Sequence, residues 1–175
     1  MRVYTSRRLL RVGLKRMRLF FAFLLSAPVS IVASQEPSRA TQVERAAAIY
    51  AAAHFSVGRV AFDPAPADVQ SVQISRSSSD IAELAKLLKA TSVAGQQTII
   101  SCADRNPSTC KMNGADLLVK IGTPSFVGDT AFVIVRTYRP THSLRTPIVR
   151  ADIKLRAERR ETGWVITSEL PGSIS

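Results

Sequence analysis

Tyr50 and His54 are the two side chains whose types and spacing could support chemistry. They are four residues apart, so on a helix they lie one turn apart on the same face. A phenol and an imidazole on one face can orient a polar ligand or move a proton, because histidine titrates near neutral pH. The alternative is structural: Tyr50 packs against a sheet, and His54 closes the helix end, where a positive charge suits the helix dipole. We favour this second interpretation, because aromatic side chains on helix faces usually belong to the core.

Cys102 and Cys110 are the two cysteines of the chain. A disulfide between them is expected in an oxidising compartment, to which the leader described below directs the chain. It would close the short loop 103–109 and stabilise the fold by roughly 2–3 kcal/mol. The alternative is a redox or metal role, but the spacing is not Cys-x-x-Cys and no histidine lies nearby in the sequence.

Other catalytic and binding motifs are missing from the sequence. Ser101 lacks the Gly-x-Ser-x-Gly context of a nucleophile elbow. The run Thr141-His142-Ser143 lies beside Pro140 and is typical of a turn, since no carboxylate is spaced to complete a triad. Neither histidine is spaced as a metal ligand, and no glycine-rich phosphate loop occurs. The sequence therefore predicts no catalytic residue, no metal and no cofactor.

The charge of the chain is concentrated at its beginning. The whole sequence has 24 basic and 13 acidic residues, a net charge of +11. Residues 1–34 contain seven of the basic residues and none of the acidic ones, so 17 basic and 13 acidic residues remain after them. A net charge of +4 without a basic run gives no reason to expect a nucleic-acid partner.

Residues 1–34 have the pattern of a signal peptide. Arg16 and Arg18 precede the uncharged segment 19–33, which at about 15 residues is short of the roughly 20 that span a membrane as a helix. Small residues before Gln35 predict cleavage after Ser34. Translation starting at Met17 would give a signal of ordinary size, whereas Arg7-Arg8 partly resembles a twin-arginine export signal. We expect a secreted or periplasmic protein that contacts membrane only through this segment, if it stays uncleaved.

Helical patterns follow a flexible leader at 35–40. Alanine-rich residues 41–54 predict a helix that begins with a capping box between Thr41 and Glu44. The run Ser77-Ser78-Ser79-Asp80 is predicted to cap a second helix, with Asp80 and Glu83 in capping-box register. The buried stripe of this helix is Ile81, Leu84, Ala85 and Leu88.

Strand patterns dominate the rest of the chain. Short β-branched stretches predict strands at 58–62, 69–74 and 97–102. Four further strands are predicted at 116–121, 130–139, 148–157 and 163–169, and apolar and polar residues alternate strictly from Val149 to Glu158. The short links between these four strands favour an antiparallel meander.

These elements predict one α+β domain over 41–175, with the N-terminal and second helices packed on a curved, mostly antiparallel sheet that ends in the four-strand meander. The segments 128–133 (GDTAFV) and 159–165 (RRETGWV) resemble the closing strands of nuclear-transport-factor-2-like domains. This resemblance implies a cone-shaped sheet with a pocket at its mouth. The family contains enzymes, ligand binders and secreted members of unknown activity, and no catalytic motif of its isomerase-like members has a counterpart here.

The sequence favours a non-catalytic binding or interaction module whose partner is a small ligand or a protein. The alternative is a small-molecule enzyme of the isomerase, hydrolase or dehydratase type, with its pocket inside the curved sheet near Tyr50. An enzyme pocket should bring several polar groups together, whereas a binding or structural member should fill the sheet with aliphatic side chains. A homodimer formed by pairing of the sheets is left open.

Overall fold

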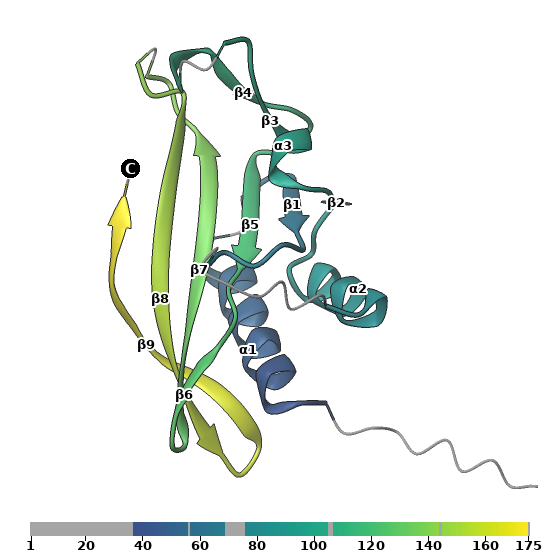
Figure 1. Cartoon of the computed structure of the whole chain (residues 1–175), viewed down its shortest axis with the longest axis vertical. Coiled ribbons are helices and arrows are strands. Elements are labelled where there is room, and N and C mark those ends of the chain that lie inside the picture. Colours follow the sequence, from purple (N-terminus) through teal and green to yellow (C-terminus); the bar gives the residue numbers. More distant parts are fainter. Residues whose placement is uncertain (1–36, 56, 69–75, 105–106, 144, 175) are drawn as a thin grey trace, which may run out of the picture. The chain divides into compact units, whose positions relative to one another are not determined.

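The computed structural model describes residues 37–55, 57–68, 76–104, 107–143 and 145–174. It has three α-helices in this part of the chain: α1 (Arg39–His54), α2 (Ser78–Leu87) and the single turn α3 (Gln96–Ile99). The strands are β1 (Val60–Asp63), β2 (Ser92–Val93), β3 (Ile100–Cys102), β4 (Cys110–Met112), β5 (Leu117–Ile121), β6 (Ser125–Val127), β7 (Thr130–Pro140), β8 (Ile148–Arg160) and β9 (Gly163–Ile174). Residues 37–175 form one compact unit (Figure 1).

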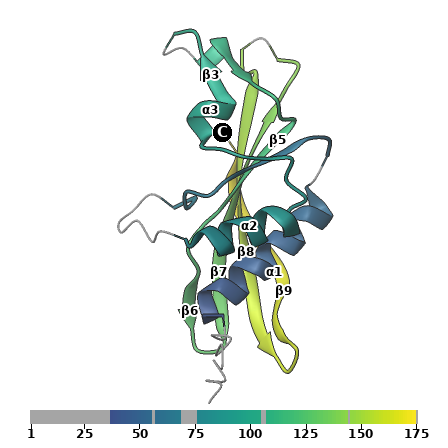
Figure 2. The same ribbon diagram turned by 90° about the vertical axis from the view of Figure 1, so that its right-hand side faces the viewer.

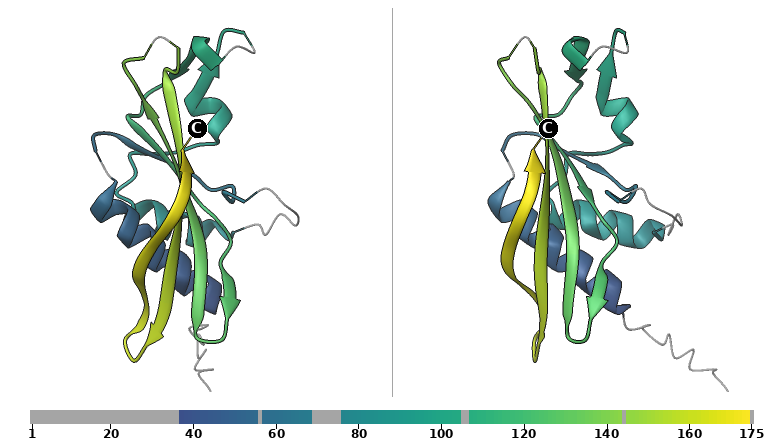
Figure 3. Two further views of the ribbon diagram at one scale, coloured as in Figure 1. Left: turned by 90° about the vertical axis from the view of Figure 1, so that its left-hand side faces the viewer. Right: turned by 60° about the vertical axis from the view of Figure 1, so that its left-hand side comes forward.

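The main sheet has the strand order β2-β1-β5-β7-β8-β9, and β6 also pairs with β7. Strands β5, β7, β8 and β9 form the predicted antiparallel meander. Strand β1 joins the sheet by pairing in parallel with β5, and β2 pairs in parallel with β1. The sheet is open, with β9 at one edge, and the predicted α+β class is confirmed (Figure 3).

Helix α1 packs across one face of the sheet, and α2 packs on α1 (Figure 2). The cap of α1 differs from the predicted capping box, because the side chain of Ser38 rather than Thr41 accepts the first hydrogen bond, from Thr41 N. The helix therefore starts at Arg39, within the segment predicted as a flexible leader. Glu44 does not cap the helix; its carboxylate points into the protein and pairs with Arg76.

Helix α2 starts within the run 77–80 that was predicted to cap it. Ser77 is the cap and accepts a hydrogen bond from Asp80 N, so Asp80 occupies the first turn and the predicted capping box with Glu83 does not form. The predicted apolar stripe of α2 is confirmed: Leu84, Ala85 and Leu88 are buried, and Ile81 packs against the same core. Burial of this stripe fixes which side of α2 faces α1.

Two of the early strand predictions differ from the structure. The predicted strand 58–62 is β1, shifted to Val60–Asp63, and the predicted strand 69–74 lies outside the described residues. The predicted strand 97–102 is divided between α3 and β3. Its first residues form a helical turn, because Thr98 N and Ile99 N donate hydrogen bonds to Gly95 O. Strand β6 lies in a segment that was predicted to be a link between two strands. It pairs with the first residues of β7, whereas β5 pairs with a later part of the same strand.

Alternation along β7 and β8 separates two sets of side chains. Val133, Val135 and Leu155 face α1 and form the main core with the helices. A smaller apolar cluster lies on the opposite face, where α3, β4 and the residues beside them cover Ala61, Leu118 and Tyr138. Successive residues of a strand point to opposite faces, so each strand contributes to both layers.

Strand β9 bends where it pairs with the first half of β8. The register shifts between Asp152 and Lys154, and Gly172 lies so close to β8 that a Cβ atom added there would be 1.7 Å from the carbonyl oxygen of Asp152. Position 172 therefore has no room for a side chain.

The ion pair of Glu44 and Arg76 connects α1 to the ends of β1 and β5. Arg76 donates to both carboxylate oxygens of Glu44, at 3.2 and 2.9 Å, and also to the carbonyl oxygens of Pro64 and Ile121. The two side chains are only 5% and 11% exposed. A charge buried to this extent is tolerated because its partner and the carbonyl groups satisfy it.

We predict that Arg76→Met lowers the free energy of unfolding by about 3–5 kcal/mol, because it leaves Glu44 buried without its partner. The double variant Glu44→Leu/Arg76→Met should recover much of this loss. Arg45→Met is the matched control, since Arg45 pairs with Glu83 at a more exposed position and should cost about 1 kcal/mol or less. Urea unfolding measures all three variants, and equal losses for Arg76→Met and Arg45→Met would contradict the prediction.

Candidate functional site

The structure places Tyr50 and His54 at the C-terminal end of α1, with their rings stacked. The ring centroids are 3.9 Å apart and the planes are inclined by 14°. His54 Nδ1 lies 2.9 Å from the backbone oxygen of Tyr50, and the His54 side chain is exposed. Tyr50 packs at the border of the main core and donates its hydroxyl hydrogen to Glu169 Oε1 at 2.8 Å.

Glu169 changes the titration of Tyr50. Partial burial raises the pKa of the Tyr50 phenol, and the hydrogen bond to Glu169 and its negative charge raise it further. The hydrogen bond of this pair connects the end of α1 to β9.

Cys102 and Cys110 form the predicted disulfide, with an S–S distance of 1.99 Å. The two residues lie directly opposite each other in the antiparallel pair β3–β4. The bond therefore closes the small two-stranded sheet that follows α3. The predicted cleavage residues Ser34 and Gln35 lie outside the described residues.

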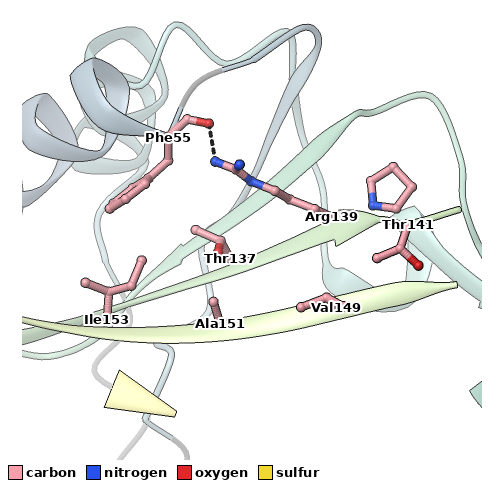
Figure 4. A pocket seen from close by; sticks show the side chains of 8 residues that line it. Phe55, Thr137, Arg139, Thr141, Val149, Ala151 and Ile153 are labelled. Carbon is pink, nitrogen blue, oxygen red and sulfur yellow. Dashed lines mark hydrogen bonds between the residues drawn. The ribbon is translucent and has the colours of Figure 1, made fainter. Parts of the chain in front are cut away.

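A groove opens on the α1 face of the sheet, just beyond the end of the helix. It has a volume of about 420 Å³ and is lined by Phe55, Thr137, Arg139, Pro140, Thr141, Val149, Ala151 and Ile153 (Figure 4). The groove exists because α1 ends at His54, whereas β7 and β8 continue past it. The apolar side chains of β8 that would otherwise be covered by a helix form its floor.

Arg139 is the only charged residue among those lining the groove in the described part of the chain. Its guanidinium group donates to the backbone oxygen of Phe55 at 2.7 Å, which places it across the groove from β8 (Figure 4). The remaining lining groups are apolar or carry a hydroxyl. Such a lining can hold a ligand that has an apolar part and one anionic group, because arginine binds carboxylates in a fixed planar geometry.

A neighbouring hollow of about 490 Å³ shares Ala151 and Ile153 with the groove and is also lined by Glu169. Arg139 therefore lines one of the two depressions, and the carboxylates of Asp152 and Glu169 line the other. An anionic group is attracted to Arg139 and repelled by Glu169, so the charges would orient a ligand.

The opposite face of the sheet carries a row of charged residues in register across four strands. Asp63, Lys120, Arg136 and Asp152 are successive Cα partners from β1 to β8. Lys120 Nζ lies 3.0 Å from Asp63 Oδ2, and Arg136 contacts both oxygens of Asp152 at 2.6 and 2.9 Å. Burial would raise the pKa of Asp152, but hydrogen bonds from Arg136 and Arg150 and their positive charges outweigh it and hold the pKa far below its usual range.

Sequence patterns did not predict the groove residues or the pair Asp63–Lys120. The groove depends on how far β7 and β8 extend beyond α1, which a local pattern does not reveal. The sequence does contain a signal for the pair, because each of the two charged residues lies in an apolar stretch. Asp63 follows residues 60–62 (VAF), and Lys120 lies within the apolar stretch 117–121 (LLVKI). A charged residue in a buried strand requires a partner, but its identity depends on strand pairing.

We predict that Tyr50→Phe lowers the free energy of unfolding by about 1 kcal/mol at pH 7, through loss of the hydrogen bond to Glu169. Since the pKa of Tyr50 is higher in the folded than in the unfolded chain, its contribution is complete below about pH 10 and is lost as the pH rises through the folded value. Urea unfolding of both proteins between pH 7 and 11 should show the difference shrinking. A difference that grows with pH would contradict this assignment.

The described residues contain no group of three or more side chains that could hold a metal ion. Within the same part of the chain, no helix has the length and apolarity needed to cross a membrane. No protein-family model, no curated protein and no solved structure matches the sequence or the fold of this chain at a significant level.

Proposed function

We propose that this chain is an exported, non-catalytic binding protein that holds a small amphipathic anion in the groove beyond α1. The observation that carries the proposal is the composition of the groove: an apolar floor on β8 with a single guanidinium group opposite it. The volume of about 420 Å³ lies within the range of small-molecule sites.

The groove favours binding over catalysis. The described residues that line it supply a cation, two hydroxyl groups and aliphatic or aromatic surface, but no carboxylate, imidazole or thiol. General acid–base or nucleophilic catalysis needs such a group within hydrogen-bond reach of the substrate. Tyr50 and Glu169 already satisfy each other beside the groove.

The apolar part of the ligand lies on Val149, Ala151 and Ile153, and its anionic group contacts Arg139. Burial of the alkyl chain supplies most of the affinity, at about 0.8 kcal/mol for each buried CH₂ group. The charge-assisted hydrogen bond fixes the orientation.

Export and family membership belong to the same proposal. The leader at 1–34 would direct the chain out of the cytoplasm, and the disulfide between Cys102 and Cys110 is consistent with an oxidising compartment. The α+β arrangement is also consistent with the resemblance of 128–133 and 159–165 to nuclear-transport-factor-2-like domains, a family that implies a cone-shaped sheet with a pocket at its mouth.

We predict that decanoate binds the exported protein saturably and that decanol, with the same chain and no charge, binds at least about tenfold more weakly. Arg139→Gln should reduce the affinity for decanoate to that for decanol. Ala151→Leu should abolish binding of both by filling the groove, whereas the control Ala82→Leu, at an exposed position of α2, should leave binding unchanged.

Titration followed by heteronuclear NMR measures these affinities and locates the perturbed amides. Shifts confined to the ends of β7 and β8 and to Phe55 are the expected result. Equal affinities for decanoate and decanol, or binding that survives Ala151→Leu, would overturn the proposal.

A further inference from the structure

A second hollow lies on the other face of the sheet, and its chemistry differs from that of the groove. It has a volume of about 390 Å³ and is lined by Asp63, Ala65, Gly95, Gln96, Gln97, Thr98 and Lys120. Lys120 shares a face with its register partner Arg136, whereas the groove residue Thr137 points to the opposite face. The two depressions are therefore independent.

Asp63 and Lys120 form a buried ion pair in the wall of this hollow. Their side chains are 4% and 9% exposed, and Lys120 Nζ lies 3.0 Å from Asp63 Oδ2. Asp63 is further satisfied by Ala65 N, which donates to Oδ1 at 2.9 Å, and by Gln96 N, which donates to Oδ2 at 2.8 Å. The carboxylate thus accepts two backbone hydrogen bonds besides its ion pair with Lys120, and it has capacity for a further donor.

Lys120 has more hydrogen-bonding capacity than the contacts within the described residues use. An ammonium group has three donors, and Asp63 accepts one of them. Burial of a charged pair costs several kcal/mol for each ion, and a pair of apolar residues of similar volume is often as stable. An ion pair buried against a hollow with donors to spare is therefore suited to receive a ligand.

We propose that this hollow binds a small, uncharged polar molecule that carries an acceptor and a donor on neighbouring atoms, as an amide or a vicinal diol does. The acceptor takes a hydrogen bond from Lys120 Nζ, and the donor gives one to the carboxylate of Asp63. Because the two charges nearly cancel, neither an anion nor a cation gains net attraction that would offset the loss of its hydration, which selects a neutral ligand. The side chains of Gln97 and Thr98, at the exposed rim of the hollow, offer further polar contacts.

The test uses the double variant Asp63→Leu/Lys120→Met, which replaces the ion pair by two apolar side chains. Single variants would leave one buried charge without its partner and lose stability for that reason alone, so a loss of binding could not be assigned to the site. Lys86→Met, at an exposed position of α2, is the control for loss of a lysine. Thermal unfolding of each protein establishes that it is folded before binding is measured.

Acetamide, glycerol and glucose serve as neutral probes, and acetate and methylammonium as charged probes of similar size. We expect at least one neutral probe to shift the NMR signals of Gln96, Gln97 and Thr98 saturably, in the wild type and in Lys86→Met. In the folded double variant its affinity should fall at least about tenfold, because two charge-assisted hydrogen bonds are lost. The charged probes should bind at least about tenfold more weakly than that neutral probe.

No saturable shift with any neutral probe, an unchanged affinity in the folded double variant, or equal binding of the charged probes would each overturn the proposal. A double variant that does not fold would also overturn it, since the pair would then be required by the fold itself. Decanoate binding in the groove on the other face is expected to be unaffected by these substitutions, so the two proposals fail separately.

Discussion

The long pairing of β7 with β8 is the constraint on which the rest of the structure depends. It runs without interruption from Thr130 opposite Glu158 to Pro140 opposite Ile148. Because side chains alternate, this register places Val133, Val135 and Leu155 under α1 and the pair Arg136–Asp152 on the opposite face. A slip of β7 by one residue relative to β8 would turn the β7 side chains to the other face, placing Arg136 beneath the helix and separating it from Asp152. Both candidate sites follow from it: the groove is the part of the apolar face that α1 does not reach, and the hollow adjoins the charged row on the other face.

The two faces also differ in what they can recognise. In the proposed groove site, an apolar surface with a single guanidinium group would select a ligand by length and charge. In the site proposed on the opposite face, the ion pair of Asp63 and Lys120 would select a neutral ligand by its pattern of donors and acceptors. Placing both on one open sheet keeps them apart, since the backbone of β7 separates Arg136 from Thr137.

Much of the fold could be predicted from the sequence, because its last third has strong local signals. The alternation from Val149 to Glu158 gave β8, and short links gave the antiparallel meander. The exact caps were harder to predict, because several residues near each helix start can cap. Ser38 caps α1 in place of the predicted Thr41, and Ser77 is the member of the predicted run 77–80 that caps α2. Three features depend on parts of the chain that are far apart in the sequence. The groove arises because β7 and β8 extend beyond α1, and the strand order determines both the parallel pairing of β1 and the position of Asp63 beside Lys120. Tyr50 and His54 do lie together, but their surroundings, above all Glu169, come from a strand more than a hundred residues away.

The close approach of Gly172 to β8 has a consequence for the behaviour of the protein in solution. Strand β9 forms the outer edge of the sheet, and it reaches Ala151 and Asp152 only because its backbone passes against the Asp152 carbonyl group without a side chain between them. Any larger residue would lift the last part of β9 away and uncover the hydrogen-bonding groups of β8. An uncovered edge can recruit strands from other molecules, so a larger residue at position 172 would add unpaired groups of β8 to the edge that β9 already presents.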